Sequence, residues 1–152
     1  MAASAWQLYN SAKRYIGNGT ITLGAGVFKM LLARSASNTS TFTLSTYASI
    51  TNEISATGGY VTGGKNLVPA TGQWTVGASA KQQKFTNSTI GLTFTASGAS
   101  LTNVKYAVIR NSTGATAGKL LCFCQLSTSQ FTVTSPNTLT ILPAATGVFT
   151  LT

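Results

Sequence analysis

Few side chains in this sequence could carry acid–base or nucleophilic chemistry. Its 152 residues include one acid, Glu53, and neither histidine nor aspartate. General acid–base catalysis commonly needs a carboxylate pair or an imidazole, and a serine or cysteine nucleophile needs a neighbouring base. Hard-metal sites need several carboxylates, and zinc sites need histidines or more than two cysteines. We therefore expect no conventional enzyme, no bound metal and no cofactor.

Cys122 and Cys124 are the two cysteines, and they lie two residues apart in an apolar run. On a strand such residues point to the same face with Cα atoms roughly 6.5–7 Å apart, at or beyond the usual limit for a disulfide. A soft-metal or redox pair is one interpretation. Buried thiols packed as small hydrophobic groups are the interpretation we favour. Free thiols indicate folding in a reducing cytoplasm.

Charged residues make up 7% of the chain, against roughly 25% in ordinary globular domains. Serine, threonine, asparagine and glutamine supply most of the polar surface instead. Such a surface is less soluble than a charged one. Either much of it is buried against other subunits, or the chain is a threonine-rich β-domain that tolerates few charges.

The ten basic residues give a net charge of +9 and are scattered through the sequence. They are Lys13, Arg14, Lys29, Arg34, Lys65, Lys81, Lys84, Lys105, Arg110 and Lys119. No arginine-rich run, RNA-binding signature or zinc-finger spacing accompanies them. Diffuse positive charge suits an acidic protein surface as well as a nucleic acid, and we favour the protein partner.

Residues 101–127 are expected to form the central hairpin of the fold. Two apolar segments, LTNVKYAVIR and LLCFCQLS, flank a loop of turn residues. Both faces of both segments are apolar, which is typical of strands in the middle of a sandwich or barrel.

An amphipathic helix is predicted for about residues 3–16. Trp6, Tyr9, Ala12 and Ile16 fall three and four residues apart, and Gly17-Asn18-Gly19 forms a stop signal. The rest of the chain predicts short strands separated by turns, including strands at 27–33 and 74–80, an interruption at 81–84 and a strand at 90–95. A short helical turn is expected around Tyr47. We predict one all-β domain over residues 1–152, a jelly-roll-like β-sandwich with a short N-terminal helix.

The start of the sequence lacks a charged segment followed by a long apolar run, so no secretory signal is expected. No stretch approaches the ~18 consecutive apolar residues of a membrane span, and no membrane contact is expected.

Several short motifs follow one another in a recognisable order. The chain opens with AWQLYNSAKRYIGNG, continues with VFKMLLARS and reaches YASITNEI at Tyr47–Ile54. GYVTGGKNL, the Gln73-Trp74 strand, KYAVIRN, KLLCF and ILPAATGVFTL complete the series. Over most of its length the chain resembles the small virion structural proteins of tailed bacteriophages, the capsid cement or decoration class.

This resemblance implies a protein that binds the outside of an icosahedral capsid and bridges subunits of the major capsid protein. It would fold in the host cytoplasm, reside on the virion exterior and form a homodimer or homotrimer. Aromatic residues and arginine often anchor interfaces, so the candidate contacts are Trp6, Tyr9, Arg14, Tyr47 and Tyr60, with the loops at 34–45 and 55–70. Each of these residues could instead belong to the core or rim of the domain.

Three other functions fit parts of the sequence. A tail, head–tail adaptor or head-fibre component would share the same β-rich, charge-poor surface. A non-specific nucleic-acid-binding β-barrel would use the basic residues with Trp74, Phe85 and Tyr106 as stacking platforms. A carbohydrate-binding sandwich is disfavoured by the lack of acids. Specific nucleic-acid recognition is not expected.

Overall fold

A computed structural model describes residues 3–67, 73–77, 79, 81–86, 91–144 and 146–151. Strands account for 39% of the chain and helices for 10%. One short α-helix lies near the N-terminus, so the predicted all-β sandwich with an N-terminal helix is confirmed. The predictions for residues 68–70, Ala80 and Ile90 lie outside the described residues.

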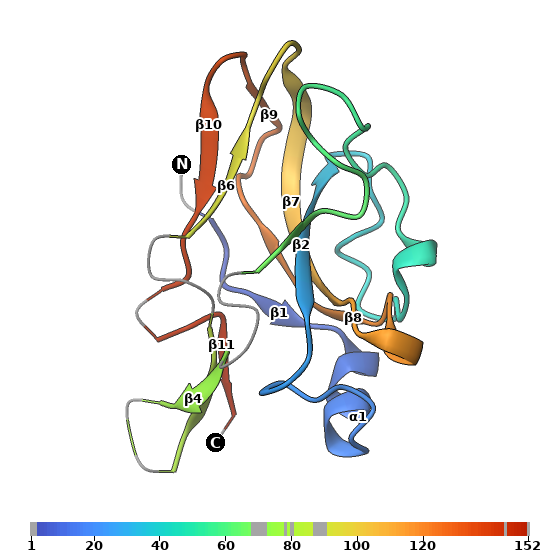
Figure 1. Ribbon diagram of the computed structural model, residues 1–152, viewed down its shortest axis with the longest axis vertical. Helices are drawn as coiled ribbons and strands as arrows, with labels where there is room; N and C mark the ends of the chain where they lie inside the picture. Colours follow the sequence, from blue (N-terminus) through green and yellow to red (C-terminus); the bar gives the residue numbers. More distant parts are fainter. Residues whose placement is uncertain are drawn as a thin grey trace.

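The largest layer is a six-stranded antiparallel sheet with the strand order β1-β8-β7-β2-β3, in which β9 also pairs with β7 (Figure 1). Its strands are β1 (Gln7–Leu8), β2 (Phe28–Arg34), β3 (Lys65–Asn66), β7 (Leu101–Asn111), β8 (Leu120–Gln125) and β9 (Phe131–Val133). The predicted hairpin forms β7 and β8, and it lies in the middle of this sheet because β2 and β1 flank it.

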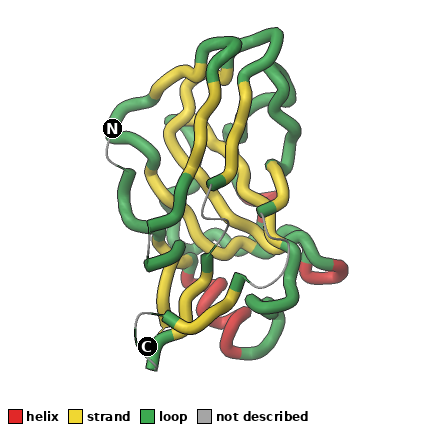
Figure 2. The backbone as a smooth tube through the Cα atoms, turned by 60° about the vertical axis from the view of Figure 1, so that its left-hand side comes forward, coloured by secondary structure: helices red, strands yellow, loops and turns green. Residues whose placement is uncertain are grey.

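Two smaller antiparallel sheets complete the sandwich. One pairs β6 (Leu92–Thr95) with β10 (Thr138–Ile141). The other has the order β11-β5-β4, formed by β4 (Trp74–Val76), β5 (Gln83–Phe85) and β11 (Phe149–Leu151). Figure 2 shows both small sheets beside the long strands of the main sheet.

Both faces of the hairpin are buried because both faces of the main sheet are covered. On one face, Phe28 of β2 meets Phe85 with ring centroids 5.0 Å apart, and Phe149 stacks on Phe85 at 5.3 Å. On the other face, Phe123 of β8 contacts Tyr9 at 5.1 Å and Phe42 at 5.4 Å. Two-sided burial explains why residues 106–109 of β7 and 120–124 of β8 are continuous apolar runs instead of alternating.

The segment between β2 and β3 covers that second face as an irregular layer, on the right of Figure 1. It contains the short 3-10 helix Tyr47–Ser49, which confirms the helical turn expected there. Its backbone pairs with the end of the hairpin, where Tyr47 N–H donates to the Gly118 carbonyl and Leu120 N–H to the Ser45 carbonyl.

The predicted helix over 3–16 is wrong in its first half. The α-helix α1 covers Asn10–Gly17, and Tyr9 is its extended N-cap residue. Residues before Tyr9 add to the edge of β8 instead, with Gln7 opposite Phe123 and Leu8 opposite Cys122. The open edge of β8 offered backbone hydrogen bonds that a local helical pattern does not reveal, so tertiary pairing overrode helix propensity.

The interruption expected at residues 81–84 is also wrong, because Gln83–Phe85 forms β5 at the centre of its sheet. The strand is three residues long, too short for alternation to be visible among polar neighbours. The strand expected at 74–80 is shorter than predicted and covers Trp74–Val76.

Candidate functional site

The lone acidic side chain is bound inside the irregular layer. One oxygen of Glu53 accepts hydrogen bonds from the Tyr60 hydroxyl and the Gly63 N–H, both at 2.6 Å. The other oxygen accepts a 2.5 Å hydrogen bond from the Tyr47 hydroxyl. Both carboxylate oxygens therefore have donors from the protein itself.

The two tyrosines that bind the carboxylate differ in how deeply they are buried. Tyr60 is 5% exposed, and its hydroxyl also accepts a hydrogen bond from the N–H of Leu32 in the main sheet. Burial, followed by the hydrogen bond to Glu53, raises the pKa of Tyr60 far above its usual range. The same causes raise the pKa of the half-buried Tyr47 to about 12. Both phenols are neutral donors at pH 7, so the cluster suits structural support better than proton transfer.

Arg110 of β7 connects this cluster to the sheet. Its guanidinium lies 4.5 Å from the centroid of the Tyr47 ring and donates two hydrogen bonds to the Gly63 carbonyl, at 3.0 and 3.2 Å. Gly63 has φ +86°, and a Cβ there would lie 2.8 Å from an Arg110 nitrogen. Glycine is therefore required where the loop meets the guanidinium.

Cations that are far apart in the sequence gather beside this cluster. Lys29 of β2 lies opposite Arg110 in the register of β2 and β7, so both side chains leave the same face. At the end of the hairpin, Lys119 bridges to Thr46, next to Tyr47. The Lys119 ammonium lies 5.1 Å from the Tyr15 ring centroid.

The Arg14 guanidinium of α1 lies 5.5 Å from the same Tyr15 ring. Four basic residues, from α1, β2, β7 and the residue just before β8, thus form a cationic strip: Arg14, Lys119, Arg110 and Lys29. Sequence spacing did not reveal the strip because strand register and the helix–hairpin contact assemble it. The alternation of side chains along β2 and β7 could have predicted that Lys29 and Arg110 lie on one face, but it gives no information on Arg14 and Lys119.

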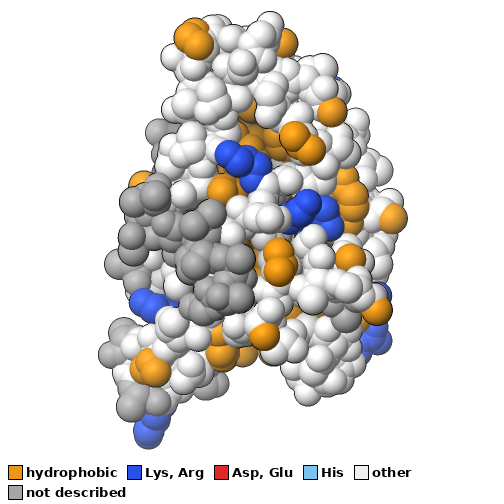
Figure 3. All heavy atoms as spheres, in the orientation of Figure 1, with side chains coloured by type: hydrophobic (Ala, Val, Ile, Leu, Met, Phe, Trp, Pro, Cys, Tyr) orange, Lys and Arg blue, Asp and Glu red, His pale blue; other side chains and the backbone are white. Residues whose placement is uncertain are grey.

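The charge at the surface is consequently almost entirely positive, because Glu53 is half-buried. Figure 3 shows Lys and Arg side chains at several places on one face and no carboxylate side chain among the described residues of that face. With a net charge of +9 and Glu53 engaged internally, the electrostatic field outside the molecule attracts acidic surfaces.

The five sequence-predicted contact residues do not share one environment. Arg14 is exposed, and Trp6 and Tyr47 are half-buried, so these three offer surface to a partner. Tyr9 is fully buried and donates a 2.9 Å hydrogen bond to the Thr39 carbonyl. Tyr9 and Tyr60 are core residues and present no surface. Arg14 belongs to the cationic strip and Tyr47 adjoins it, whereas Trp6 lies in a groove described below.

The stacking platforms considered for nucleic acid are mostly covered. Phe85 is fully buried and Tyr106 is 7% exposed. Trp74 is half-buried against Phe149, with ring centroids 6.3 Å apart. Stacking of bases on Phe85 or Tyr106 would require the residues that cover these rings to move away.

The two cysteines are free and buried, as the interpretation as packed thiols predicts. Burial raises the pKa of Cys122, and it raises the pKa of Cys124 to about 11. Cys124 donates a hydrogen bond of 3.5 Å to the Ser4 carbonyl. Within the described residues, no group of three or more metal-binding side chains comes together. None of the described helices is both long and apolar enough to span a bilayer.

Searches with this chain against protein-family models, curated proteins and solved structures returned no match.

Proposed function

We propose that this protein is a virion structural protein of a tailed bacteriophage, a cement protein that binds the outside of the icosahedral head. It would bridge neighbouring subunits of the major capsid protein and stabilise the shell. The phage assignment comes from the ordered sequence motifs that resemble this class.

The observation that carries the proposed role is the almost entirely positive surface. The chain has one acidic side chain, and Tyr47, Tyr60 and Gly63 occupy both of its oxygens. Glu53 lies near Arg110 across Gly63 and Tyr47, so one carboxylate stands against the four cations of the strip and leaves the strip net positive. Lys29 and Arg110 repel each other across β2 and β7, and an acidic partner that binds both relieves this repulsion.

A rigid core supports the same role. The hairpin is buried on both faces, and the irregular layer is fixed to it through Arg110 and Glu53. A cement protein needs a stiff body that presents the same contacts to many equivalent sites. Each contact can be weak, because simultaneous contacts to adjacent subunits add through avidity.

The direct test is the location and copy number of the chain in purified particles. Cryo-electron microscopy should reveal its density on the outer face of the shell, and quantitative mass spectrometry should count hundreds of copies per particle. Density at the portal vertex or tail, with a dozen copies or fewer, would contradict the cement role and favour the adaptor, tail or head-fibre alternative.

A binding titration tests the recruitment mechanism. Binding of the purified chain to heads that lack it should weaken markedly between about 0.1 M and about 1 M salt, because the Debye length falls from about 10 Å to about 3 Å. A gel shift with duplex DNA at about 0.15 M salt should give little retention. Tight, salt-sensitive DNA retention would favour the nucleic-acid alternative.

A further inference from the structure

The charged residues occupy only the middle of the sequence. All eleven lie between Lys13 and Lys119, so residues 1–12 and 120–152 carry no charged side chain. The two uncharged segments meet in space, because β1 pairs with β8 and the Ser4 N–H donates to the Gln125 carbonyl at 2.8 Å.

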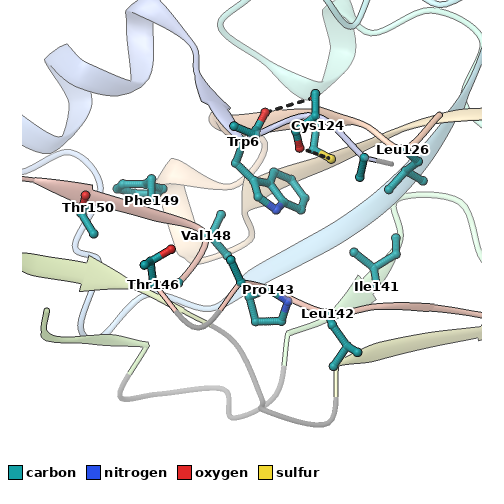
Figure 4. A pocket seen from close by; sticks show the side chains of 15 residues that line it. Trp6, Cys124, Leu126, Ile141, Leu142, Pro143, Thr146, Val148, Phe149 and Thr150 are labelled. Carbon is teal, nitrogen blue, oxygen red and sulfur yellow. Dashed lines mark hydrogen bonds between the residues drawn. The ribbon is translucent and has the colours of Figure 1, made fainter. Parts of the chain in front are cut away.

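A groove of about 550 Å³ lies between these two segments. One wall is the N-terminal stretch Ala3–Trp6, and the other is the C-terminal stretch from Ile141 to Thr150. Figure 4 shows the Trp6 indole extending into the groove toward Pro143 and Val148, with Cys124 above it and Leu126 to its right in the view. None of the described residues that line it is charged.

A second hollow continues the groove along β10. Its lining shares Ala3, Leu126, Ile141 and Leu142 with the first and adds Phe131, Leu139 and Thr140. Leu139 is half-buried, and Leu142, directly after β10, is 58% exposed. The groove is therefore an apolar surface bordered by one strand.

The strand that borders the groove also has a free edge. Among the described strands, β10 pairs with β6 alone. The Ala96 N–H donates to the Asn137 carbonyl at 2.9 Å, next to the Thr138–Thr95 register pair. Because bonded and non-bonded pairs alternate, the peptide groups of Thr138 and Thr140 point away from β6. The edge has neither the lysine nor the proline that protects many exposed strands.

We propose that two copies of this chain associate through this surface. The β10 edge of one copy pairs with the β10 edge of the other, antiparallel and around a two-fold axis. The two ribbons then form one four-stranded sheet, β6-β10-β10-β6, and each copy covers Leu139 and Leu142 of the other. Such an interface is isologous and closes at the dimer.

Charge identifies a second copy as the occupant. Two molecules that each carry +9 repel each other, and the described lining of the groove and the second hollow has no charged side chain, so they can meet there with no cation in the contact itself. Lys84, which pairs with Thr150, and Lys65, which donates to the Thr93 carbonyl of β6, lie beside this surface. In Figure 3, no Lys or Arg side chain is drawn on the upper left edge, where β10 runs in Figure 1. An acidic partner is drawn instead to the cationic strip.

The test is the mass of the purified full-length chain in solution. Sedimentation velocity and light scattering over the micromolar range should give a concentration-dependent rise from 15.7 kDa to twice that mass. Leu142→Arg places a cation in the interface and should weaken the dimer about tenfold or more. Thr140→Pro removes an outward N–H and no backbone hydrogen bond to β6, and should do the same. It also removes the 2.9 Å hydrogen bond between the Thr140 and Thr93 hydroxyls, a loss that Thr140→Val shares while it keeps the N–H.

Val61→Arg and Val76→Arg are matched controls. They add the same charge at apolar side chains that are 66% and 60% exposed but lie outside the groove. Both should dimerise almost as well as the unmodified chain. A thermal melt of every variant separates loss of the dimer from loss of the fold.

Hydrogen exchange gives a second measurement that needs no variant. The amides of Thr138 and Thr140 should become protected as the concentration rises through the dimer transition. A monomer at all concentrations, or full dimerisation of both Leu142→Arg and Thr140→Pro, would overturn the proposal. A trimer or larger species would overturn the two-fold β10 pairing.

The effect of salt distinguishes this dimer from the proposed binding to the capsid. Added salt screens the repulsion between two +9 copies, so the dimer should strengthen as salt rises. Binding to an acidic shell should weaken under the same change. Either proposal can therefore fail while the other holds.

Discussion

The hydroxyl of Tyr47 donates a 2.5 Å hydrogen bond to Glu53, the one acidic side chain in the protein. The ring of Tyr47 simultaneously lies 4.5 Å from the Arg110 guanidinium. Tyr47 thus holds a negative and a positive group at separate ends of one side chain. This arrangement gives the carboxylate its hydrogen-bond donors within the irregular layer and fixes the Arg110 guanidinium beside it.

Removing the carboxylate should destabilise the fold. Glu53→Ala leaves the hydroxyl of Tyr60 and the N–H of Gly63 without their acceptor, and both residues are buried. Unsatisfied buried donors of this kind predict a loss of about 2–4 kcal/mol in the free energy of unfolding. Chemical denaturation measures it.

Tyr47→Phe is a milder substitution in the same cluster, because it deletes one half-buried hydroxyl donor and keeps the aromatic ring beside Arg110. Its expected loss is about 0.5–1.5 kcal/mol. Equal stability of Glu53→Ala and the unmodified protein would show that the cluster contributes nothing to the fold.

High pH should weaken the protein partly through Tyr47. Its pKa is about 12 in the folded protein, against an ordinary value of 10.0. As pH rises, the unfolded chain loses the proton first, so this contribution is complete below pH 10 and disappears between pH 10 and about 12.

The measurement is the difference in unfolding free energy between the unmodified protein and Tyr47→Phe, followed from about pH 9 to about pH 12. Lysine titration is common to both proteins and cancels in the difference. The difference should shrink with pH. A difference that stays constant would mean that Tyr47 ionises equally easily in both states.

Strand patterning predicted the parts of this molecule that local sequence controls. Both strands of the central hairpin, its two-sided burial and the free thiols of Cys122 and Cys124 follow from apolar runs around a polar turn. The helix start was misplaced because the edge of β8, more than a hundred residues away, pairs with Gln7 and Leu8. Local periodicity contains no information on such a partner.

The candidate site was less accessible from sequence for the same reason. Lys29 and Arg110 are eighty-one positions apart and become neighbours only through the register of β2 and β7. The buried state of Tyr9 and Tyr60 likewise depends on Phe123 and Phe94, with which their rings pack at 5.1 and 6.0 Å. Aromatic residues at interfaces and in cores have the same local signature.

Substitutions in the cationic strip should separate binding from stability. Lys29→Gln removes one of two like charges that lie opposite each other, so it should raise the unfolding free energy by about 0.2–0.5 kcal/mol. The same change should weaken binding to acidic heads and reduce its salt dependence.

Lys81→Gln is the matched control, because Lys81 is exposed, outside the strip and of equal charge. It should leave stability unchanged and reduce binding less than Lys29→Gln. If both variants bind equally, net charge alone recruits the protein, and the strip has no special role.

The last prediction concerns the thiol behind the groove. Cys124 lies beneath the N-terminal stretch that includes Trp6, and its pKa is about 11 instead of 9.0. Since the thiolate is the reactive form, a Cys122→Ala protein should react with a disulfide reagent at about pH 8 at least about 100-fold more slowly when folded than in denaturant.

Adding Trp6→Ala should open the groove and speed the reaction of the folded protein several-fold. Phe42→Ala, which removes a 44% exposed ring packed on Phe123, should leave the rate unchanged. An unchanged rate in Trp6→Ala would mean that the backbone of the N-terminal stretch, and not the indole, shields the thiol.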